Sequence, residues 1–128
     1  MIYLDTSVAL AHLLAEDRQP RDALWNETLV SSRLLEYEAW IRVNARGLGG
    51  SHGEALRELL ARVALVEMVP PVLARALEPY PVPVRTLDAL HLATIDWLRA
   101  QGQRVALASY DERLLASARA LDVAIYGL

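Results

Sequence analysis

Four acidic residues stand where an acid is hard to explain by folding alone. They are Asp5, Glu38, Asp88 and Asp111. Asp5 and Asp111 each follow a short apolar run that is typical of a buried strand, whereas Asp88 and Glu38 interrupt apolar stretches that are typical of helices. If folding gathers the four side chains, they form a carboxylate pocket that can bind a divalent cation. This pattern therefore suggests a metal-dependent enzyme.

Gathered carboxylates repel one another, and the repulsion indicates what partner they need. Each pair costs about 4 kcal/mol at roughly 4 Å with an effective dielectric constant near 20. A helix N-terminus offsets only about 0.3–1 kcal/mol, so protons or a cation must balance the charge. Oxygen ligands without any thiol favour Mg²⁺ or Mn²⁺ over zinc. The implied reaction is hydrolysis of a phosphodiester by water, with a carboxylate assisting proton removal.

Segments with strand character alternate with segments of helical character along the chain. The expected strands are 2–4, 28–31, 64–69, 104–108 and 123–126. The expected helices are 7–15, 21–26, 32–46, 53–62, 70–76, 86–101 and 111–121. Prolines make 79–84 an extended connection rather than a central strand. The alternation predicts an α/β fold with a parallel sheet covered by helices on both faces.

The predicted sheet brings the four acids to one place. Ligands of open α/β sheets bind beyond the carboxyl ends of the strands. Asp5 ends the first strand and Asp111 follows the fourth, so both lie at that edge. Asp88 and Glu38 lie early in helices that begin at the same edge. We therefore expect the four residues to converge on a common rim and to share a cation.

Each acid also has a simpler structural interpretation. Asp5 and Asp111 both precede helices and are plausible N-caps. Thr86 is the better cap for the helix that carries Asp88, which leaves Asp88 as a first-turn acid favoured by the helix dipole. No single acid is convincing alone, and their shared location is what favours a functional site.

Glu38 has a specific competing interpretation. Arg42 follows it by four residues, the spacing of an ordinary solvated ion pair on a helix. Glu36 is a competitor for the same role in the site.

Hydroxyl and histidine side chains near the acids are secondary candidates. Thr6 and Ser7 could orient water at the site, although helix capping is the competing role. Ser109 could bind phosphate or simply begin the turn before Asp111. His91 lies one helical turn after Asp88, and we expect a packed histidine rather than a catalytic base.

Arginines flank the acids and could hold phosphate groups. The candidates are Arg85, Arg113 and Arg42, with surface ion pairs as the alternative for each.

Asp96 is expected to be a peripheral, structural acid. The aromatic residues fall mostly on apolar helix faces, which favours core or dimer contacts over base stacking; they are Trp25, Trp40, Trp97 and Tyr37.

Length and composition limit the class of protein. The 128 residues fit one domain, 1–128, and 54% of them are hydrophobic, enough for a core without disulfides. The absence of cysteine excludes thiol catalysis and zinc–thiolate sites. Net charge is −3, yet outside the four acids 12 acidic residues face 13 arginines, so a metal-filled pocket would not repel phosphate. No signal peptide or membrane span is expected, and cytoplasmic location is the default.

Four motifs in order resemble those of the PIN-domain family, and specifically of its VapC-type toxins. The motifs are Tyr3-Leu4-Asp5-Thr6-Ser7, Ser32-Arg33-Leu34-Leu35-Glu36-Tyr37-Glu38, Arg85-Thr86-Leu87-Asp88-Ala89-Leu90-His91-Leu92-Ala93-Thr94 and Ser109-Tyr110-Asp111-Glu112-Arg113-Leu114. The resemblance covers essentially the whole chain. It implies a three-layer α/β/α fold with a mainly parallel central sheet of four to five strands.

The resemblance also implies an activity and partners. The family's acids fall on Asp5, Glu38, Asp88 and Asp111, and its hydroxyl residue before the last acid falls on Ser109. It implies a Mg²⁺- or Mn²⁺-dependent endoribonuclease that is inhibited by a cognate antitoxin. It further implies a homodimer in which the antitoxin's C-terminal segment crosses the acidic groove.

Three other functions compete with a toxin ribonuclease. A non-toxin PIN nuclease would act in RNA processing or on structured DNA. A catalytically silent binding module would keep the fold and lose cleavage, and the intact acid set argues against it. A phosphorylatable receiver-like domain shares acids at strand ends, but it needs a lysine and this chain has none.

Overall fold

The computed structural model describes all residues, 1–128, and its centre is a five-stranded sheet in which every pair of neighbouring strands is parallel. The strand order is β3-β2-β1-β4-β5. The strands are β1 (Ile2–Leu4), β2 (Leu29–Ser32), β3 (Val63–Val66), β4 (Ala106–Ala108) and β5 (Ala124–Ile125). The prediction of a mainly parallel sheet of four to five strands is confirmed.

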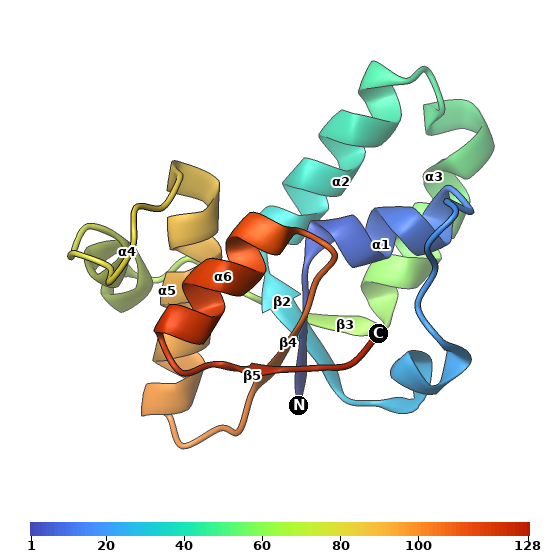
Figure 1. The fold of residues 1–128 in the computed structure, drawn as a ribbon. Coiled ribbons are helices and arrows are strands. Elements are labelled where there is room, and N and C mark those ends of the chain that lie inside the picture. Colours follow the sequence, from blue (N-terminus) through green and yellow to red (C-terminus); the bar gives the residue numbers. More distant parts are fainter.

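Helices cover both faces of this sheet (Figure 1). They are α1 (Thr6–Leu13), the 3₁₀ helix η1 (Asp22–Asn26), α2 (Leu34–Ala45), α3 (Gly49–Ala61), α4 (Pro70–Ala76), α5 (Thr86–Ala100) and α6 (Glu112–Ala120). One layer is formed by α1, α2 and α3, and the other by α5 and α6, with α4 packed on α5. None of the helices is both long and apolar enough to cross a membrane.

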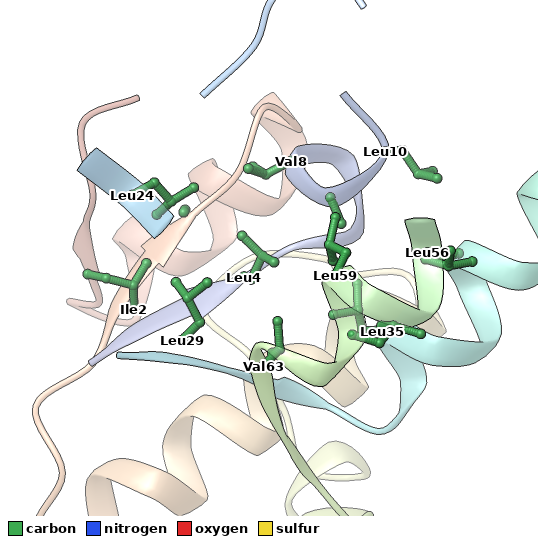
Figure 2. Close-up of a cluster of buried hydrophobic side chains, with 14 of the residues drawn as sticks. Ile2, Leu4, Val8, Leu10, Leu24, Leu29, Leu35, Leu56, Leu59 and Val63 are labelled. Carbon is green, nitrogen blue, oxygen red and sulfur yellow. The ribbon is translucent and has the colours of Figure 1, made fainter. Parts of the chain in front are cut away.

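Alternation of side chains along the strands produces two cores, one on each face. Ile2 and Leu4 of β1 point to the core shared with α1, α2 and α3, whereas Tyr3 between them points to the core shared with α5 and α6. The first core contains Leu35 and Leu56, both fully buried (Figure 2). Burial of both faces explains why the strands read as continuous apolar runs rather than as alternating patterns.

Several element boundaries differ from those expected from sequence. Gly47 follows the end of α2 with a positive φ of 67°, and the next helix, expected from residue 53, already begins at Gly49. The strand expected at 104–108 begins only at Ala106, and the strand expected at 64–69 is Val63–Val66. The proline-rich segment 79–84 forms no strand, as predicted, but it bends at Pro81 and Val82 instead of running extended throughout.

The sheet topology fixes which residues meet at its carboxyl edge. β1 lies between β2 and β4, and Leu4 pairs with Ala108 in register. The Asp5 amide then donates to the Ala108 carbonyl oxygen at 3.0 Å, which extends the pairing by one residue. Asp5 and Ser109 are therefore neighbours at the ends of adjacent strands.

We predict that Leu56→Ala lowers the free energy of unfolding by about 2–5 kcal/mol, because it leaves a cavity among fully buried side chains. Leu77→Ala is the matched control, since Leu77 is 89% exposed and should change stability by less than about 0.5 kcal/mol. Urea denaturation measures both variants. Equal losses for the two leucines would contradict the packing described here.

Candidate active site at the carboxyl edge of the sheet

The four predicted acids line one pocket of about 270 Å³ at the carboxyl edge of the sheet. The lining residues are Asp5, Thr6, Ser7, Leu10, Glu38, Ile41, Arg42, Leu87, Asp88, His91 and Asp111. A larger hollow of about 690 Å³ lies between α4 and the start of α5, is lined largely by apolar residues and contains none of the four acids. We identify the smaller pocket as the candidate site because it holds the chemically active groups.

Asp5 is held at the junction of β1 and α1. Its Oδ2 atom accepts hydrogen bonds from the Ser7 hydroxyl at 2.6 Å, the Ser109 hydroxyl at 2.8 Å and the Ser7 amide at 3.4 Å. Asp5 is the N-cap of α1 and also lines the pocket, so it is a helix cap and a pocket residue at the same time. The side chain is rigidly placed, and the Asp5 residue is only 7% exposed.

Glu38 reaches the pocket from the second turn of α2. Its Oε1 atom accepts from the Thr6 hydroxyl at 3.0 Å and lies 2.6 Å from the His91 Nε2 atom. No ion pair joins Glu38 to Arg42, so that interpretation of their spacing is wrong; Arg42 lines the pocket instead. Tertiary partners on α1 and α5 have replaced the local partner on α2.

Glu36 is directed elsewhere and does not line the pocket. Its carboxylate lies 3.5 Å from the Arg33 guanidinium, which also binds Glu67 at 2.6 Å. Of the two glutamates that competed for the role, Glu38 is the one at the site.

Asp111 is the N-cap of α6 and lies on the exposed side of the pocket. Its Oδ1 atom accepts from the backbone amides of Arg113 at 2.9 Å and Leu114 at 3.2 Å. The Asp111 amide donates to the Ser109 hydroxyl oxygen at 2.9 Å. Ser109 therefore links the first and last acids, because its own hydroxyl donates to Asp5.

Asp88 is the only one of the four acids whose side chain has no hydrogen-bond partner in the protein. It is the third residue of α5, whose N-cap is Arg85 without any side-chain capping bond. Thr86 lies inside the helix, so its predicted capping role is wrong. Burial raises the pKa of Asp88, and the charges of Asp111 and Asp5 raise it further.

The three held carboxylates share one feature. In each of them a single oxygen accepts all the protein hydrogen bonds: Oδ2 of Asp5, Oε1 of Glu38 and Oδ1 of Asp111. The second oxygen of each side chain has no protein donor. Such a set offers one oxygen per acid to a ligand in the pocket, which is how carboxylates commonly bind Mg²⁺.

The donor set therefore suits a hard divalent cation, although the side chains do not form a preformed cage. No group of three or more His, Asp or Glu side chains is arranged so closely that it could hold a metal ion without movement. Repulsion between unneutralised carboxylates acts against such closeness. The assignment of the four acids as metal ligands stays a prediction.

His91 is buried on α5, 1% exposed, and contacts Glu38 directly. Its Nδ1 atom lies 2.7 Å from the Tyr3 hydroxyl. Burial lowers the pKa of His91, but the hydrogen bond to Glu38 and the nearby carboxylates outweigh burial, so the pKa is raised overall. The expected packed histidine is therefore also a direct partner of a pocket acid. Tyr3 was not singled out from the sequence, because it lies within an apolar strand; only its hydroxyl distinguishes it there.

The remaining candidates divide into those at the pocket and those outside it. Thr6 and Ser7 line the pocket, and Ser109 holds Asp5. Arg85 lines the apolar hollow, and exposed Arg113 does not line the acidic pocket.

Asp96 pairs with Arg75 at 3.0 Å and with Arg99 at 3.5 Å, a structural role as expected. Tyr37 is 57% exposed, so a core role is wrong for it, whereas the three tryptophans are partly buried.

Comparisons with known proteins agree on one family. A PIN-domain family model matches residues 2–120. Ribonuclease VapC35 of Mycobacterium tuberculosis is 34% identical over 98% of this chain and 95% of its own length. Ribonuclease VapC47 of the same species is 31% identical over 93% of this chain and 90% of its own length. No solved structure gives a significant match.

We predict that Asp88→Asn raises the melting temperature of the metal-free protein by about 1–4 °C. The charge of Asp88 is disfavoured by burial and by Asp111 and Asp5, which outweighs the weak favourable effect of the helix N-terminus. Because the folded-state pKa is raised, the gain should be present at neutral pH and disappear as acidification protonates the wild-type side chain. Calorimetry in a chelating buffer measures this, with Asp17→Asn as the exposed control. A lower melting temperature for Asp88→Asn at neutral pH would contradict the electrostatic account.

Proposed function

Because this chain belongs to the PIN-domain family, we propose that it is the toxin of a VapBC-type toxin–antitoxin pair, a metal-dependent endoribonuclease that hydrolyses RNA phosphodiester bonds. Both relatives carry the name ribonuclease and are matched over nearly their full lengths. The observation that carries the proposal is the pocket at the sheet edge, where four carboxylates gather and three of them keep one oxygen free of protein donors.

The pocket fits Mg²⁺ or Mn²⁺ best, since its ligands are hard oxygens and it contains no sulfur. Asp5, Glu38, Asp88 and Asp111 would hold the ion. When bound, such an ion lowers the pKa of a water molecule and neutralises charge that develops on the phosphodiester.

The protein's own residues would place and tune these acids. Ser7 and Ser109 hold Asp5, and Thr6 and His91 hold Glu38. Asp88 differs from these three acids, because no protein donor holds its carboxylate and burial raises its pKa in the metal-free pocket. We therefore assign Asp5, Glu38 and Asp111 a fixed ligating role, and Asp88 the role of a movable ligand whose carboxylate can also assist proton removal from water.

Arginines would contact the RNA backbone around this pocket. Arg42 lines the pocket and has no carboxylate partner in the chain. Arg85 and Arg113 lie outside the pocket lining and would bind phosphates further along the strand. Thr6 and Ser109 would act on substrate only through the acids they hold.

The proposed partners are RNA, a cognate antitoxin protein and a second copy of the chain. An antitoxin that inhibits the enzyme would cover the acidic pocket, and an arginine of that partner would pair with the unbonded carboxylate oxygens. Exposed apolar side chains beside the pocket, Ile41 at 65% and Leu87 at 48%, offer contact area for such a segment. The homodimer remains part of the proposal.

We predict that the purified protein cleaves RNA in the presence of Mg²⁺ or Mn²⁺, and that Asp5→Asn and Asp88→Asn each lower the rate at least about 100-fold, as expected when a transition-state interaction is lost. Glu36→Gln is the matched control, because Glu36 pairs with Arg33 outside the pocket and should retain activity. Gel analysis of labelled RNA provides the measurement.

Two outcomes would separate the competing functions. Full activity in both aspartate variants would exclude this centre, and an inactive wild type that still binds RNA would indicate a silent binding module. Induction in a bacterium without the antitoxin distinguishes a toxin from a processing nuclease, because a harmless active enzyme contradicts toxicity. Sequencing of RNA ends after brief induction would identify the substrate.

Metal binding should stabilise the fold. A ligand that binds only the native state raises the free energy of unfolding by about 2.7 kcal/mol when its concentration is a hundred times its dissociation constant. We therefore predict that Mg²⁺ or Mn²⁺ raises the melting temperature of the wild type by several degrees, about 4 °C or more. The shift should shrink in Asp5→Asn and persist in Glu36→Gln. Thermal denaturation over a metal titration tests this, and an undiminished shift in Asp5→Asn would place the ion elsewhere.

A further inference from the structure

A buried chain of hydrogen bonds runs from the central sheet to Glu38. The Ser32 amide donates to the Tyr3 hydroxyl oxygen at 3.2 Å. The Tyr3 hydroxyl lies 2.7 Å from His91 Nδ1, and His91 Nε2 lies 2.6 Å from Glu38 Oε1. Tyr3 and Ser32 are fully buried and His91 is 1% exposed, so water does not compete for these bonds.

The groups at its two ends determine which atoms donate and which accept along this series of hydrogen bonds. The Ser32 amide can only donate, so the Tyr3 oxygen accepts there and its own hydrogen is free for His91 Nδ1. An ionised Glu38 can only accept, so His91 Nε2 must carry a hydrogen. Burial raises the pKa of Tyr3, which keeps the phenol protonated. Both the neutral Nε2–H tautomer and the charged imidazole place a hydrogen on Nε2, so the bond from His91 to Glu38 keeps its direction in either state. The Tyr3 hydroxyl donates to Nδ1 when the ring is neutral and accepts from Nδ1 when the ring is charged.

We propose that His91 and Tyr3 are positioning residues for Glu38: they fix its Oε1 atom through His91 Nε2 so that Oε2 is presented to the pocket. The proposal rests on the function proposed above, because it concerns the same acid set. His91 acts on Glu38 directly, and Tyr3 acts one step behind by orienting the imidazole.

The placement of these groups favours positioning over simple packing. Glu38 extends from α2 in one helical layer and His91 from α5 in the other, and Tyr3 of β1 lies between the layers. A phenylalanine would fill the position of Tyr3 in the core without burying a hydroxyl, and a leucine would fill much of the volume of His91. The polar groups instead form a continuous series of contacts that ends on Glu38 Oε1.

Without His91, Glu38 would keep only the bond from Thr6 at 3.0 Å. A glutamate has three rotatable side-chain bonds, and a single hydroxyl donor leaves the carboxylate free to rotate about that contact. We therefore expect the free oxygen to lose its orientation, with weaker metal binding and little change in RNA binding.

Three variants separate the contributions of the individual hydrogen bonds. His91→Leu removes both nitrogens, Tyr3→Phe removes only the hydroxyl, and His91→Gln retains an N–H donor in place of Nε2. Tyr80→Phe is the matched control, because the Tyr80 hydroxyl donates to the Ala89 carbonyl of α5 at 3.0 Å and is not part of this chain.

The principal measurement is Mn²⁺ affinity without RNA, from the electron paramagnetic resonance signal of free Mn²⁺. His91→Leu should weaken binding about 10–100-fold, Tyr3→Phe should weaken it less, and His91→Gln should recover most of the loss. Tyr80→Phe should leave it unchanged. In cleavage assays kcat should fall for His91→Leu and Tyr3→Phe, while KM for RNA stays within about twofold.

Two results would overturn the proposal. The first is Mn²⁺ affinity in Tyr3→Phe and His91→Leu equal to that of the wild type in folded proteins; if His91→Leu does not fold, Tyr3→Phe and His91→Gln decide the question. The second is a neutral His91 ring in which ¹⁵N resonance finds Nε2 without its hydrogen. If the wild type binds no Mn²⁺ at all, the metal-dependent function fails, and the resonance measurement still decides the arrangement of His91.

Discussion

Repulsion between like charges is the constraint on which the site depends. Four carboxylates share one pocket, and any pair brought to about 4 Å would cost on the order of 4 kcal/mol at an effective dielectric constant near 20. The protein offsets part of that cost by directing donors at a single oxygen of each held acid. The donors are hydroxyls, one imidazole, the Ser7 amide of α1 and two early amides of α6. The remaining oxygens have no protein donor, so the contacts that stabilise these acids also leave one oxygen of each available to a cation.

The parallel sheet makes this arrangement possible with short strands. β1 has only three residues, yet it is the central strand, and both of its neighbours end at the same edge. The pairing of Leu4 with Ala108 places Asp5 beside Ser109, whose hydroxyl in turn meets the start of α6. The two helical layers then contribute one acid each, Glu38 from α2 and Asp88 from α5. Residues far apart in sequence meet because strand ends and helix starts coincide there.

The sequence predicted the features that depend on periodicity and topology, and it missed those that depend on tertiary partners. Apolar runs alternating with helical patterns were enough to predict the parallel sheet and to place the acids at its edge. Local rules failed wherever a distant group offered a stronger contact. The four-residue spacing of Glu38 and Arg42 predicted an ion pair, but Glu38 binds Thr6 and His91 instead. Thr6 and Ser7 have hydroxyls suited to capping, yet they act as donors to carboxylates. Tyr3 could not be found, because in an apolar strand its hydroxyl has no sequence neighbour that signals a use.

The unequal support of the four acids has a chemical consequence. Asp5, Glu38 and Asp111 are each fixed by at least two donors, whereas Asp88 has none, although it lies in the first turn of a helix where a negative charge is favoured. Its charge is therefore the one most sensitive to the occupant of the pocket: neighbouring acids and burial disfavour it, and a cation would favour it. Under the proposed function, the three fixed carboxylates would hold the cation, and the unheld carboxylate of Asp88 would be free to adjust to it and to assist proton removal from water.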